Sequence, residues 1–249
     1  MMGSQLFMNY DLLIADIGNS RIKFCDNETY FAIEYSEGFE KRVEHYIQSF
    51  ALNKRIVYSS VNYKSELILL KLLSKLEIPF NKVDIYLSKQ KMINLDFVSG
   101  AGTDRVLGLI GAWNKNINSF ITIDFGSATT INYVLNSKFI GGSIMLGAEN
   151  QLISLGNIST KLKFDKLSIQ GSSFGNDTYA AVNSGIYLST IGAIEKALEI
   201  SSTLYDGELN KAIFTTGGLA DIFSPHLSKN SPIIYRPHLV IEGIKKLTE

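Results

Sequence analysis

One short pattern occurs twice in this sequence, first as IADIGNS at residues 14–20 and again as ITIDFGSATT at residues 121–130. Each copy is a short apolar run of the kind found in buried strands, followed by an aspartate, a glycine and small polar residues. A second strand-like run follows each copy directly, so each predicts a β-hairpin. Two such hairpins, one in each half of the chain, predict two similar lobes that face each other across a cleft.

The turns of these hairpins have the chemistry of an anion site. Glycine permits a positive φ and the close approach of a ligand, and successive N–H groups in a turn form an anion-binding concavity. The hydroxyls of Ser20 and Ser127 could add donors. An aspartate beside a bound phosphate needs a cation between them, so Asp16 and Asp124 predict Mg²⁺ or another hard cation. Lys23, on the strand after the first turn, could balance phosphate charge.

An ordinary hairpin turn is the alternative interpretation, since Asp-x-Gly-Asn is common in such turns. Either copy alone leaves the two interpretations open, whereas both copies together favour phosphate binding. The phosphate-binding loop Gly-x-x-x-x-Gly-Lys-Ser/Thr is absent. Residues 100–105 begin like the dinucleotide motif Gly-x-Gly-x-x-Gly, but Arg105 takes the place of the third glycine, which excludes that motif.

The segment Gly102-Thr103-Asp104-Arg105 precedes an apolar run of helical type. Its spacing favours a helix cap, with Thr103 or Asp104 as the N-cap residue. A functional alternative stays open. Arg105 could grip a carboxylate through two parallel hydrogen bonds, and Asp104 could accept the proton of a hydroxyl that attacks phosphorus.

The amino-acid composition excludes several classes of protein. Among 249 residues, 24 basic side chains balance 24 acidic ones, which favours neither a nucleic-acid partner nor a disordered acidic chain. The single cysteine, Cys25, excludes a disulfide framework, and the three histidines share no metal-binding spacing. No apolar run approaches the length of a membrane span. The beginning of the chain lacks the features of a signal peptide, so we expect a cytoplasmic protein without a membrane or nucleic-acid partner.

The remaining pattern alternates strands and helices, with boundaries expected to be accurate to ~2–4 residues. The predicted strands are 10–17, 21–26, 29–35, 55–59, 82–86, 119–125, 130–135, a strand starting at 138–140, 212–215 and 233–235. The predicted helices are 38–50, 65–76, 103–113, about 179–204 and 239–247. We expect an N-terminal lobe over residues 1–117 and a C-terminal lobe over residues 118–249.

An ordered set of motifs resembles the type III pantothenate kinase family, which belongs to the superfamily of sugar kinases, actin and heat-shock ATPases. The set runs in the family's order through the chain. It comprises Asp-x-Gly-Asn-Ser-x-x-Lys at 16–23, Gly-x-Asp-Arg at 102–105, Asp-x-Gly-Ser-Ala-x-Thr at 124–130, Gly-Gly-x-Ile-x-Leu-Gly at 141–147, Thr-x-x-Ala at 178–181 with Ser-Gly at 184–185, Thr-Gly-Gly at 216–218, and 239–244. Serine stands at 20 and 127 where the family has threonine, so both hydroxyls are kept.

This resemblance implies an α/β fold with two ribonuclease-H-like or actin-like lobes, each a mixed sheet flanked by helices. It implies ATP-dependent phosphorylation of pantothenate to 4′-phosphopantothenate, the first step of coenzyme A synthesis, and a homodimer with a shared active site. Another small-molecule kinase of the superfamily, or a regulatory relative without catalysis, stays open as an alternative. Mg²⁺ and a monovalent cation, K⁺ or NH₄⁺, are the implied cofactors, and ATP is the co-substrate.

The resemblance also assigns roles to individual residues. Asp104 would accept the proton, Asp124 would bind the monovalent cation and Asp16 is the candidate for Mg²⁺. Glycines 217 and 218 could form an adenosine platform or simply a tight turn. The ATP-binding residues would be Asp16, Ile17, Gly18, Asn19, Ser20, Arg21, Ile22, Lys23 and Ser127, and the pantothenate-binding residues Gly102, Thr103, Asp104, Arg105 and, from the partner subunit, Thr178.

Overall fold

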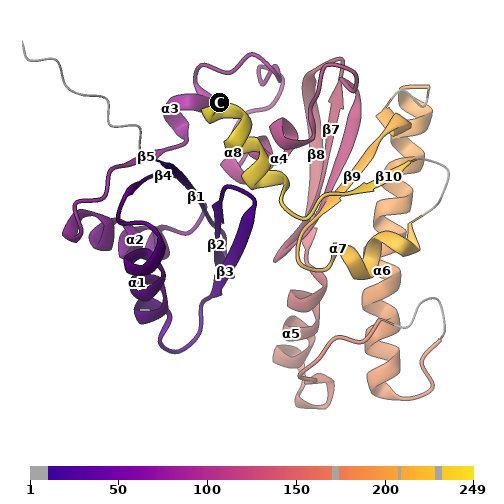
Figure 1. The fold of residues 1–249 in the computed structure, drawn as a ribbon. Coiled ribbons are helices and arrows are strands. Elements are labelled where there is room, and N and C mark those ends of the chain that lie inside the picture. The colour runs from indigo at the N-terminus through magenta and orange to yellow at the C-terminus, as the bar shows by residue number, and fades with distance from the viewer. Residues whose placement is uncertain (1–10, 170–173, 207–208, 228–231) are drawn as a thin grey trace, which may run out of the picture. The chain divides into compact units, whose positions relative to one another are not determined.

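A computed structural model describes residues 11–169, 174–206, 209–227 and 232–249 (Figure 1). Two five-stranded sheets carry the fold, in the orders β3-β2-β1-β4-β5 and β8-β7-β6-β9-β10. The strands are β1 (Asp11–Ile17), β2 (Arg21–Asp26), β3 (Thr29–Glu34), β4 (Lys54–Ser60), β5 (Phe80–Lys82), β6 (Phe120–Phe125), β7 (Ala128–Leu135), β8 (Lys138–Leu146), β9 (Ile213–Thr216) and β10 (Ile233–Tyr235).

The two sheets have the same topology. In each, the first strand pairs antiparallel with the second and the second with the third, and the first also pairs in parallel with a strand that follows a helix. A further parallel strand completes each sheet. This repetition confirms the prediction of two similar halves, each with a mixed sheet.

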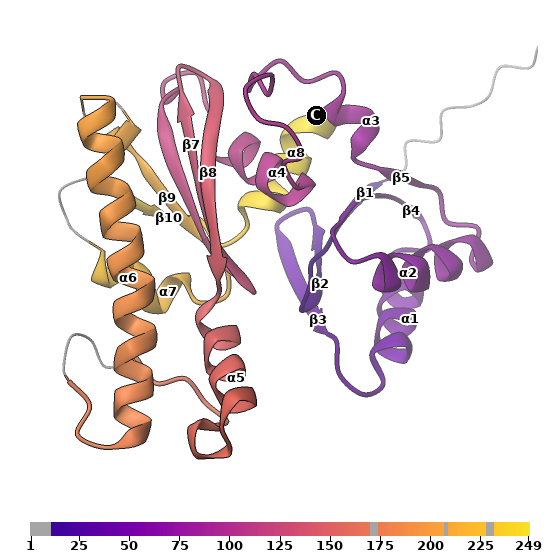
Figure 2. The same cartoon turned by 180° about the vertical axis from the view of Figure 1, so that it is seen from behind.

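Helices flank both sheets (Figure 2). They are α1 (Phe39–Phe50), α2 (Tyr63–Lys75), α3 (Asp84–Leu87), α4 (Thr103–Ala112), α5 (Ala148–Ile158), α6 (Thr178–Leu204), α7 (Ala220–Phe223) and α8 (Leu239–Thr248), with short 3₁₀ turns at Thr160–Leu162, Leu209–Lys211 and Ser224–His226. In the part of the chain that the structure describes, none of the helices is long and apolar enough to cross a bilayer.

Contacts within the chain define two compact units. The first unit contains residues 1–90, 102–107 and 240–249, and the second contains residues 91–101 and 108–239. The sequence predicts a single boundary at 117/118, whereas these contacts join three separate segments in the first unit. The reason is packing: Ile241 and Ile244 of α8 are buried with Leu107 of α4 and with strand residues of the first sheet.

Side-chain alternation gives the first sheet its two faces. Leu13, Ala15 and Ile17 of β1 are buried in a cluster with apolar residues of α1 and α2. Ile14 belongs to the cluster with α4 and α8 instead. Since successive strand side chains point to opposite faces, Asp16 shares the face of Ile14, at the end of β1.

The second sheet is built in the same way. Ile121, Ile123 and Phe125 of β6 lie in a core with α5, α6 and α7. The alternate positions, Thr122 and Asp124, therefore face the opposite side. Both predicted aspartates thus lie on the face of their sheet that is not covered by the larger helical core.

One predicted element was wrong, and one long helix was missed. The range 82–86 was predicted as a strand, but the strand β5 ends at Lys82 and residues 84–87 form the short helix α3. The helix α5 was not predicted at all. Its first turn follows the glycines at 141, 142 and 147, which break the apolar periodicity used to find helices.

Candidate functional site

The turn between β1 and β2 is closed by its own backbone. The Gly18 N–H donates to the Arg21 carbonyl oxygen at 3.1 Å. Asn19 and Ser20 at its tip are exposed. Gly18 is not among the glycines with positive φ, so this turn does not use the conformational freedom that glycine permits. A Cβ built on Gly18 would meet only the Arg21 carbonyl, at an ordinary 3.4 Å. The chain itself therefore leaves room for a side chain at this position.

The other residues of the motif at 16–23 lie on different faces of the first sheet. Ile17 and Ile22 are fully buried in the core, so only their backbone groups could meet a ligand. Arg21 is half-buried and its guanidinium lies 3.5 Å from the Glu34 carboxylate. Lys23 is directly opposite Asp16 in the antiparallel pair and shares its face.

Asp16 lies on this face near the end of β1 and is only 7% exposed. Ser59 of β4 pairs with it in register, and the Ser59 hydroxyl donates to Asp16 Oδ1 at 2.9 Å. Burial raises the pKa of the Asp16 carboxyl, while Lys23 and the Ser59 hydrogen bond oppose that rise and the charge of Asp104 adds to it. The proximity of Asp104 brings two of the predicted site carboxylates together within the first unit.

Asp104 lies in the first turn of α4. The Gly102 carbonyl accepts a hydrogen bond from the Val106 N–H at 3.2 Å, which makes Gly102 the residue that caps the helix. The prediction of Thr103 or Asp104 as N-cap was therefore wrong by one or two positions. The Asp104 carboxylate accepts from the Arg105 N–H at 2.8 Å, and a carboxylate is favoured at this end of a helix. Burial lowers the pKa of the Arg105 guanidinium, and the adjacent Asp104 opposes this shift.

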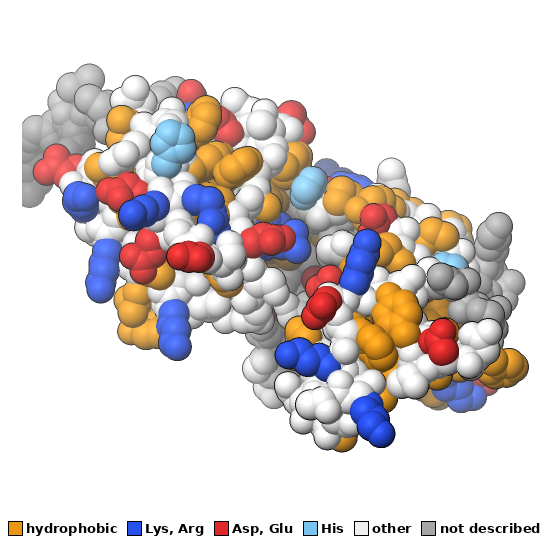
Figure 3. All heavy atoms as spheres, turned by 90° about the horizontal axis from the view of Figure 1, so that it is seen from below, with side chains coloured by type: hydrophobic (Ala, Val, Ile, Leu, Met, Phe, Trp, Pro, Cys, Tyr) orange, Lys and Arg blue, Asp and Glu red, His pale blue; other side chains and the backbone are white. Residues whose placement is uncertain are grey.

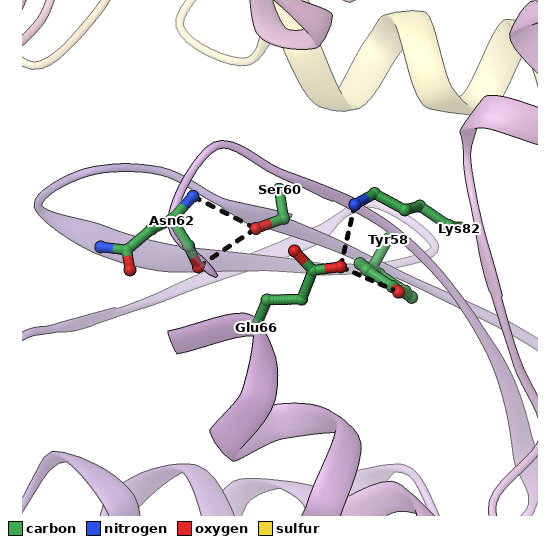
Figure 4. A network of polar contacts seen from close by, with 5 residues as sticks. All are labelled: Tyr58, Ser60, Asn62, Glu66 and Lys82. Atoms are coloured by element: carbon green, nitrogen blue, oxygen red, sulfur yellow. Dashed lines mark hydrogen bonds and ion pairs between the residues drawn. The ribbon is translucent and has the colours of Figure 1, made fainter. Parts of the chain in front are cut away.

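A polar network holds the end of β4 against the start of α2 (Figure 4). Glu66 Oε1 accepts from Lys82 Nζ at 2.9 Å and from the Tyr58 hydroxyl at 3.2 Å. The Ser60 hydroxyl donates to the Asn62 carbonyl, and the Asn62 N–H donates back to the Ser60 hydroxyl oxygen, both at 3.2 Å. This network fixes the strand end that carries Ser59, and through Ser59 it supports Asp16.

Within the second unit, Asp124 occupies the position that matches Asp16. Thr130 of β7 and Thr216 of β9 pair with it on either side, so a carboxylate and two hydroxyls share one face. A Cβ on Gly126 would lie 3.3 Å from Asp124 Oδ1, and a Cβ on Gly217 would overlap the same oxygen. Gly217 also has φ +99°. The glycines at 126 and 217 are therefore required where the backbone passes close to this carboxylate.

The second turn is held from outside by the start of α5. The Gly147 N–H donates to the Ser127 carbonyl at 3.1 Å, and Asn150 Nδ2 donates to the same oxygen at 2.8 Å. A Cβ on Gly147 would overlap the Gly126 carbonyl oxygen. This close approach explains the last glycine of the motif at 141–147.

Thr178 is exposed in the first turn of α6, which Asp177 caps by accepting a hydrogen bond from the Ala180 N–H at 2.8 Å. The contacts described above thus unite Asp16, Lys23 and Asp104 within the first unit, and Asp124, Gly126 and Gly217 within the second. The sequence did not identify Ser59 in the first unit or Asn150 in the second, because each reaches its turn or carboxylate by strand pairing or helix packing rather than by a motif.

The chemistry of these groups fits hard cations. Mg²⁺ in phosphate-binding proteins is held by one or two carboxylates together with substrate phosphates and water, and Asp16 with its neighbour Asp104 offers such a set. No larger cluster of three or more metal-ligating side chains occurs among the described residues. The oxygen atoms around Asp124 suit a hard cation as well.

Comparison with known proteins identifies the family. The sequence profile of the family described as type III pantothenate kinase matches residues 12–199. A type III pantothenate kinase from Sulfurihydrogenibium sp. (strain YO3AOP1) is 32% identical over 153 residues, which cover 61% of this chain and 59% of that protein. A second one, from Psychrobacter arcticus (strain DSM 17307 / VKM B-2377 / 273-4), is 27% identical over 248 residues, covering 94% of this chain and 97% of that protein. The matched region thus spans about three fifths of the first relative and nearly all of the second.

Solved structures agree on the fold. A protein from Campylobacter jejuni, named as a member of the Baf family of transcriptional activators, has a TM-score of 0.65 and 25% identity over 94% of this chain and 96% of that one. The apo ParM protein of psk41 has a TM-score of 0.52 at 13% identity, covering 95% of this chain and 96% of its own, which supports the actin-like fold alone. Because the family profile covers most of the sequence and its motifs occupy the strand ends described above, the chain belongs to the type III pantothenate kinase family.

Proposed function

We propose that this protein transfers the γ-phosphoryl group of ATP to the hydroxyl of pantothenate, giving 4′-phosphopantothenate and ADP, the first step of coenzyme A synthesis. The observation that carries the proposal is the convergence of Asp16, Lys23, Ser59 and Asp104 in the first unit. Phosphoryl transfer requires charge neutralisation and a group that accepts the proton of the attacking hydroxyl, and these residues supply both.

Asp104 is the proposed proton acceptor. The pantothenate hydroxyl oxygen forms a bond to the γ-phosphorus, the bond from that phosphorus to the ADP oxygen breaks, and the hydroxyl proton passes to the Asp104 carboxylate. Arg105, with the Gly102 and Thr103 backbone, would hold the pantothenate carboxylate by a bidentate contact. A charged clamp also distinguishes this reaction from phosphorylation of an uncharged sugar by another kinase of the superfamily.

The two turns are the proposed phosphate sites. N–H groups at the tip of the first turn, at residues 19 and 20, and the Lys23 ammonium would bind ATP phosphates, and the Ser127 hydroxyl is a further proposed phosphate contact. Mg²⁺, held by Asp16 and the phosphates, would neutralise the charge that develops during transfer. Asp124, with its neighbours Thr130 and Thr216, would hold the monovalent cation K⁺ or NH₄⁺ that the family uses.

We further propose a cytoplasmic homodimer in which Thr178 of one subunit contacts pantothenate bound to the other. Exposed apolar side chains on neighbouring elements support this: Ile144 and Leu146 of β8, Ile153 of α5 and Leu188 of α6. Gln151 joins these elements, since its amide donates to the Leu146 carbonyl at 2.9 Å and its Oε1 accepts from the Ser189 hydroxyl at 2.7 Å. Exposed apolar side chains mark an interaction surface where they form one contiguous patch, which the proposed dimer requires of these four.

A regulatory role without catalysis is the competing function, and the name of the Campylobacter relative mentions transcription. The equal numbers of acidic and basic residues do not favour nucleic-acid binding. On the face drawn in Figure 3, charges of both signs are intermixed. Retention of Asp16, Asp104 and Asp124 also favours the kinase, because a relative without catalysis has no need of these carboxylates.

The decisive experiment measures product formation from ATP and pantothenate with Mg²⁺ by mass spectrometry and ³¹P NMR, with K⁺ and Na⁺ compared at equal ionic strength. We expect phosphopantothenate and a preference for K⁺. Product without a cation preference would keep the kinase and refute the cation role of Asp124. Nucleotide binding without product would refute pantothenate as acceptor, and glucose and acetate would then be tested in the same assay.

A further inference from the structure

Tyr35, directly after β3, contacts the first phosphate turn at two points. Its backbone N–H donates to the Ser20 carbonyl oxygen at 3.1 Å, and its hydroxyl donates to the Gly18 carbonyl oxygen at 2.8 Å. One residue therefore engages two of the three carbonyls between β1 and β2.

The hydroxyl contact sets the direction of one peptide group. In a trans peptide the carbonyl and the following N–H point in opposite directions, and no cis peptide occurs in the described chain. Because the Gly18 carbonyl is directed at the Tyr35 hydroxyl, the Asn19 N–H must point away from Tyr35. N–H groups presented by a turn are the donors that bind phosphate oxygens.

The position of the Tyr35 ring is itself fixed. Phe39 of α1 packs edge-on against it, with ring centroids 4.8 Å apart. Burial raises the pKa of the Tyr35 hydroxyl, Ser65 of α2 opposes that rise and the charge of Asp16 adds to it. Phe39 of α1 thus holds the ring whose hydroxyl contacts the turn.

We propose that Tyr35 is a positioning residue for nucleotide binding, whose hydroxyl holds the Gly18–Asn19 peptide so that the Asn19 N–H is presented to an ATP phosphate. The proposal rests on the proposed function, in that it takes the first turn as a phosphate site. It adds a residue outside the motif at 16–23.

The test is Tyr35→Phe, which removes the hydroxyl and keeps the ring against Phe39. We expect KM for ATP to rise about three- to tenfold, the effect of losing one neutral hydrogen bond, with KM for pantothenate unchanged. Tyr46→Phe is the matched control. Tyr46 lies on α1, its ring stacks on Phe24 at 4.6 Å, and loss of its hydroxyl should change neither constant. A general loss of stability would not raise KM for ATP while leaving KM for pantothenate unchanged.

Calorimetric titration with MgADP separates this proposal from the proposed function, since it needs no acceptor substrate. If the wild type binds MgADP and Tyr35→Phe binds it several-fold more weakly, the role of Tyr35 stands even if pantothenate is not the acceptor. Equal affinities in the two proteins would overturn the proposal, whatever the enzyme phosphorylates.

Discussion

Asp16 combines burial with negative charge, and the two are in conflict. Burial raises the pKa of its carboxyl, so the folded state binds the proton more tightly than the unfolded chain does. Stability therefore falls as pH rises from the usual carboxyl range through the folded-state pKa, and above it the penalty is present in full. Magnesium binding requires the charged form. A residue that destabilises the fold but serves the ligand is typical of a functional site.

Replacing Asp16 with Asn should therefore stabilise the protein and abolish turnover. The amide oxygen can still accept from Ser59, while the buried charge is gone. We expect the melting temperature at pH 7 to rise, by ~2–4 °C for each kcal/mol recovered in a chain of this size. The gain should shrink as the pH is lowered toward the usual carboxyl range, because the raised pKa of Asp16 lets the wild-type carboxyl take up its proton there.

Asp26→Asn is the matched control for this experiment. Asp26 lies on β2 and its carboxylate is bound by Lys54 Nζ at 2.5 Å, in a pair that is largely shielded from solvent. Its neutralisation should not raise the melting temperature. An unchanged or lowered melting temperature in Asp16→Asn would show that the burial of the Asp16 charge carries no penalty.

Asp104→Asn tests the proposed proton acceptor. The amide keeps an oxygen for the Arg105 N–H but cannot take a proton. We expect kcat to fall by about 10²–10⁴, the usual contribution of a general base, and calorimetry to show nearly unchanged affinity for MgATP. Turnover close to that of the wild type would remove Asp104 from this role.

At the scale of elements, the start of α5 braces the second turn. Gly147 has φ −66°, which suits any residue, so its glycine is required by packing against the Gly126 carbonyl alone. Gly147→Ala should lower the free energy of unfolding by about 1–3 kcal/mol, as overpacking usually does, and should raise KM for ATP by displacing the Ser127 turn. Denaturant unfolding and steady-state kinetics measure the two effects.

Gly192→Ala provides the comparison. Gly192 lies in the middle of α6, and a Cβ there would meet nothing within 4 Å. The same substitution at this site should add about 0.5–1 kcal/mol, because alanine is the better helix former. If both variants lose stability equally, the contact between α5 and the second turn is not what requires Gly147.

The elements that the sequence predicted well are those whose signal is local. The turn at Asn136 and Ser137 has φ of +50° and +58°, the conformation of a two-residue hairpin loop, and lies between two predicted strands. The strand predicted at 82–86 failed because residues 84–87 are too few to show a helical period. Local pattern cannot separate such short elements.

The same limit applies to the site. Asp16 and Asp124 were found because each ends a strand before a glycine turn. Ser59 reaches Asp16 only through the parallel pairing of β1 and β4, which are 43 residues apart at this pair. Tyr35 reaches Gly18 because β3 pairs with β2, which places the residue after β3 beside the turn before β2. Contacts of this kind depend on which residues of neighbouring strands face each other. That pairing register cannot be predicted from the sequence of either strand alone.

At the scale of the whole molecule, the proposed dimer makes a prediction about assembly. Ile153 of α5 is 59% exposed and is one of the four apolar side chains of the proposed interface. Ile153→Glu would place a charge where the partner should cover it, and an uncompensated charge in an interface is strongly unfavourable. Light scattering after gel filtration should give twice the 27.6 kDa chain mass for the wild type and the monomer mass for this variant.

Ile85→Glu controls for the loss of an exposed isoleucine. Ile85 of α3 is 49% exposed in the first unit, and its substitution should leave the dimer intact.

If Thr178 completes the partner's pantothenate site, the monomeric Ile153→Glu variant should also lose activity with pantothenate while it still binds MgADP, because the nucleotide-binding residues come from one chain. A monomer with full activity would show that Thr178 does not act in trans. A dimer that persists in Ile153→Glu would place the interface elsewhere and leave the exposed side chains of β8, α5 and α6 without this role.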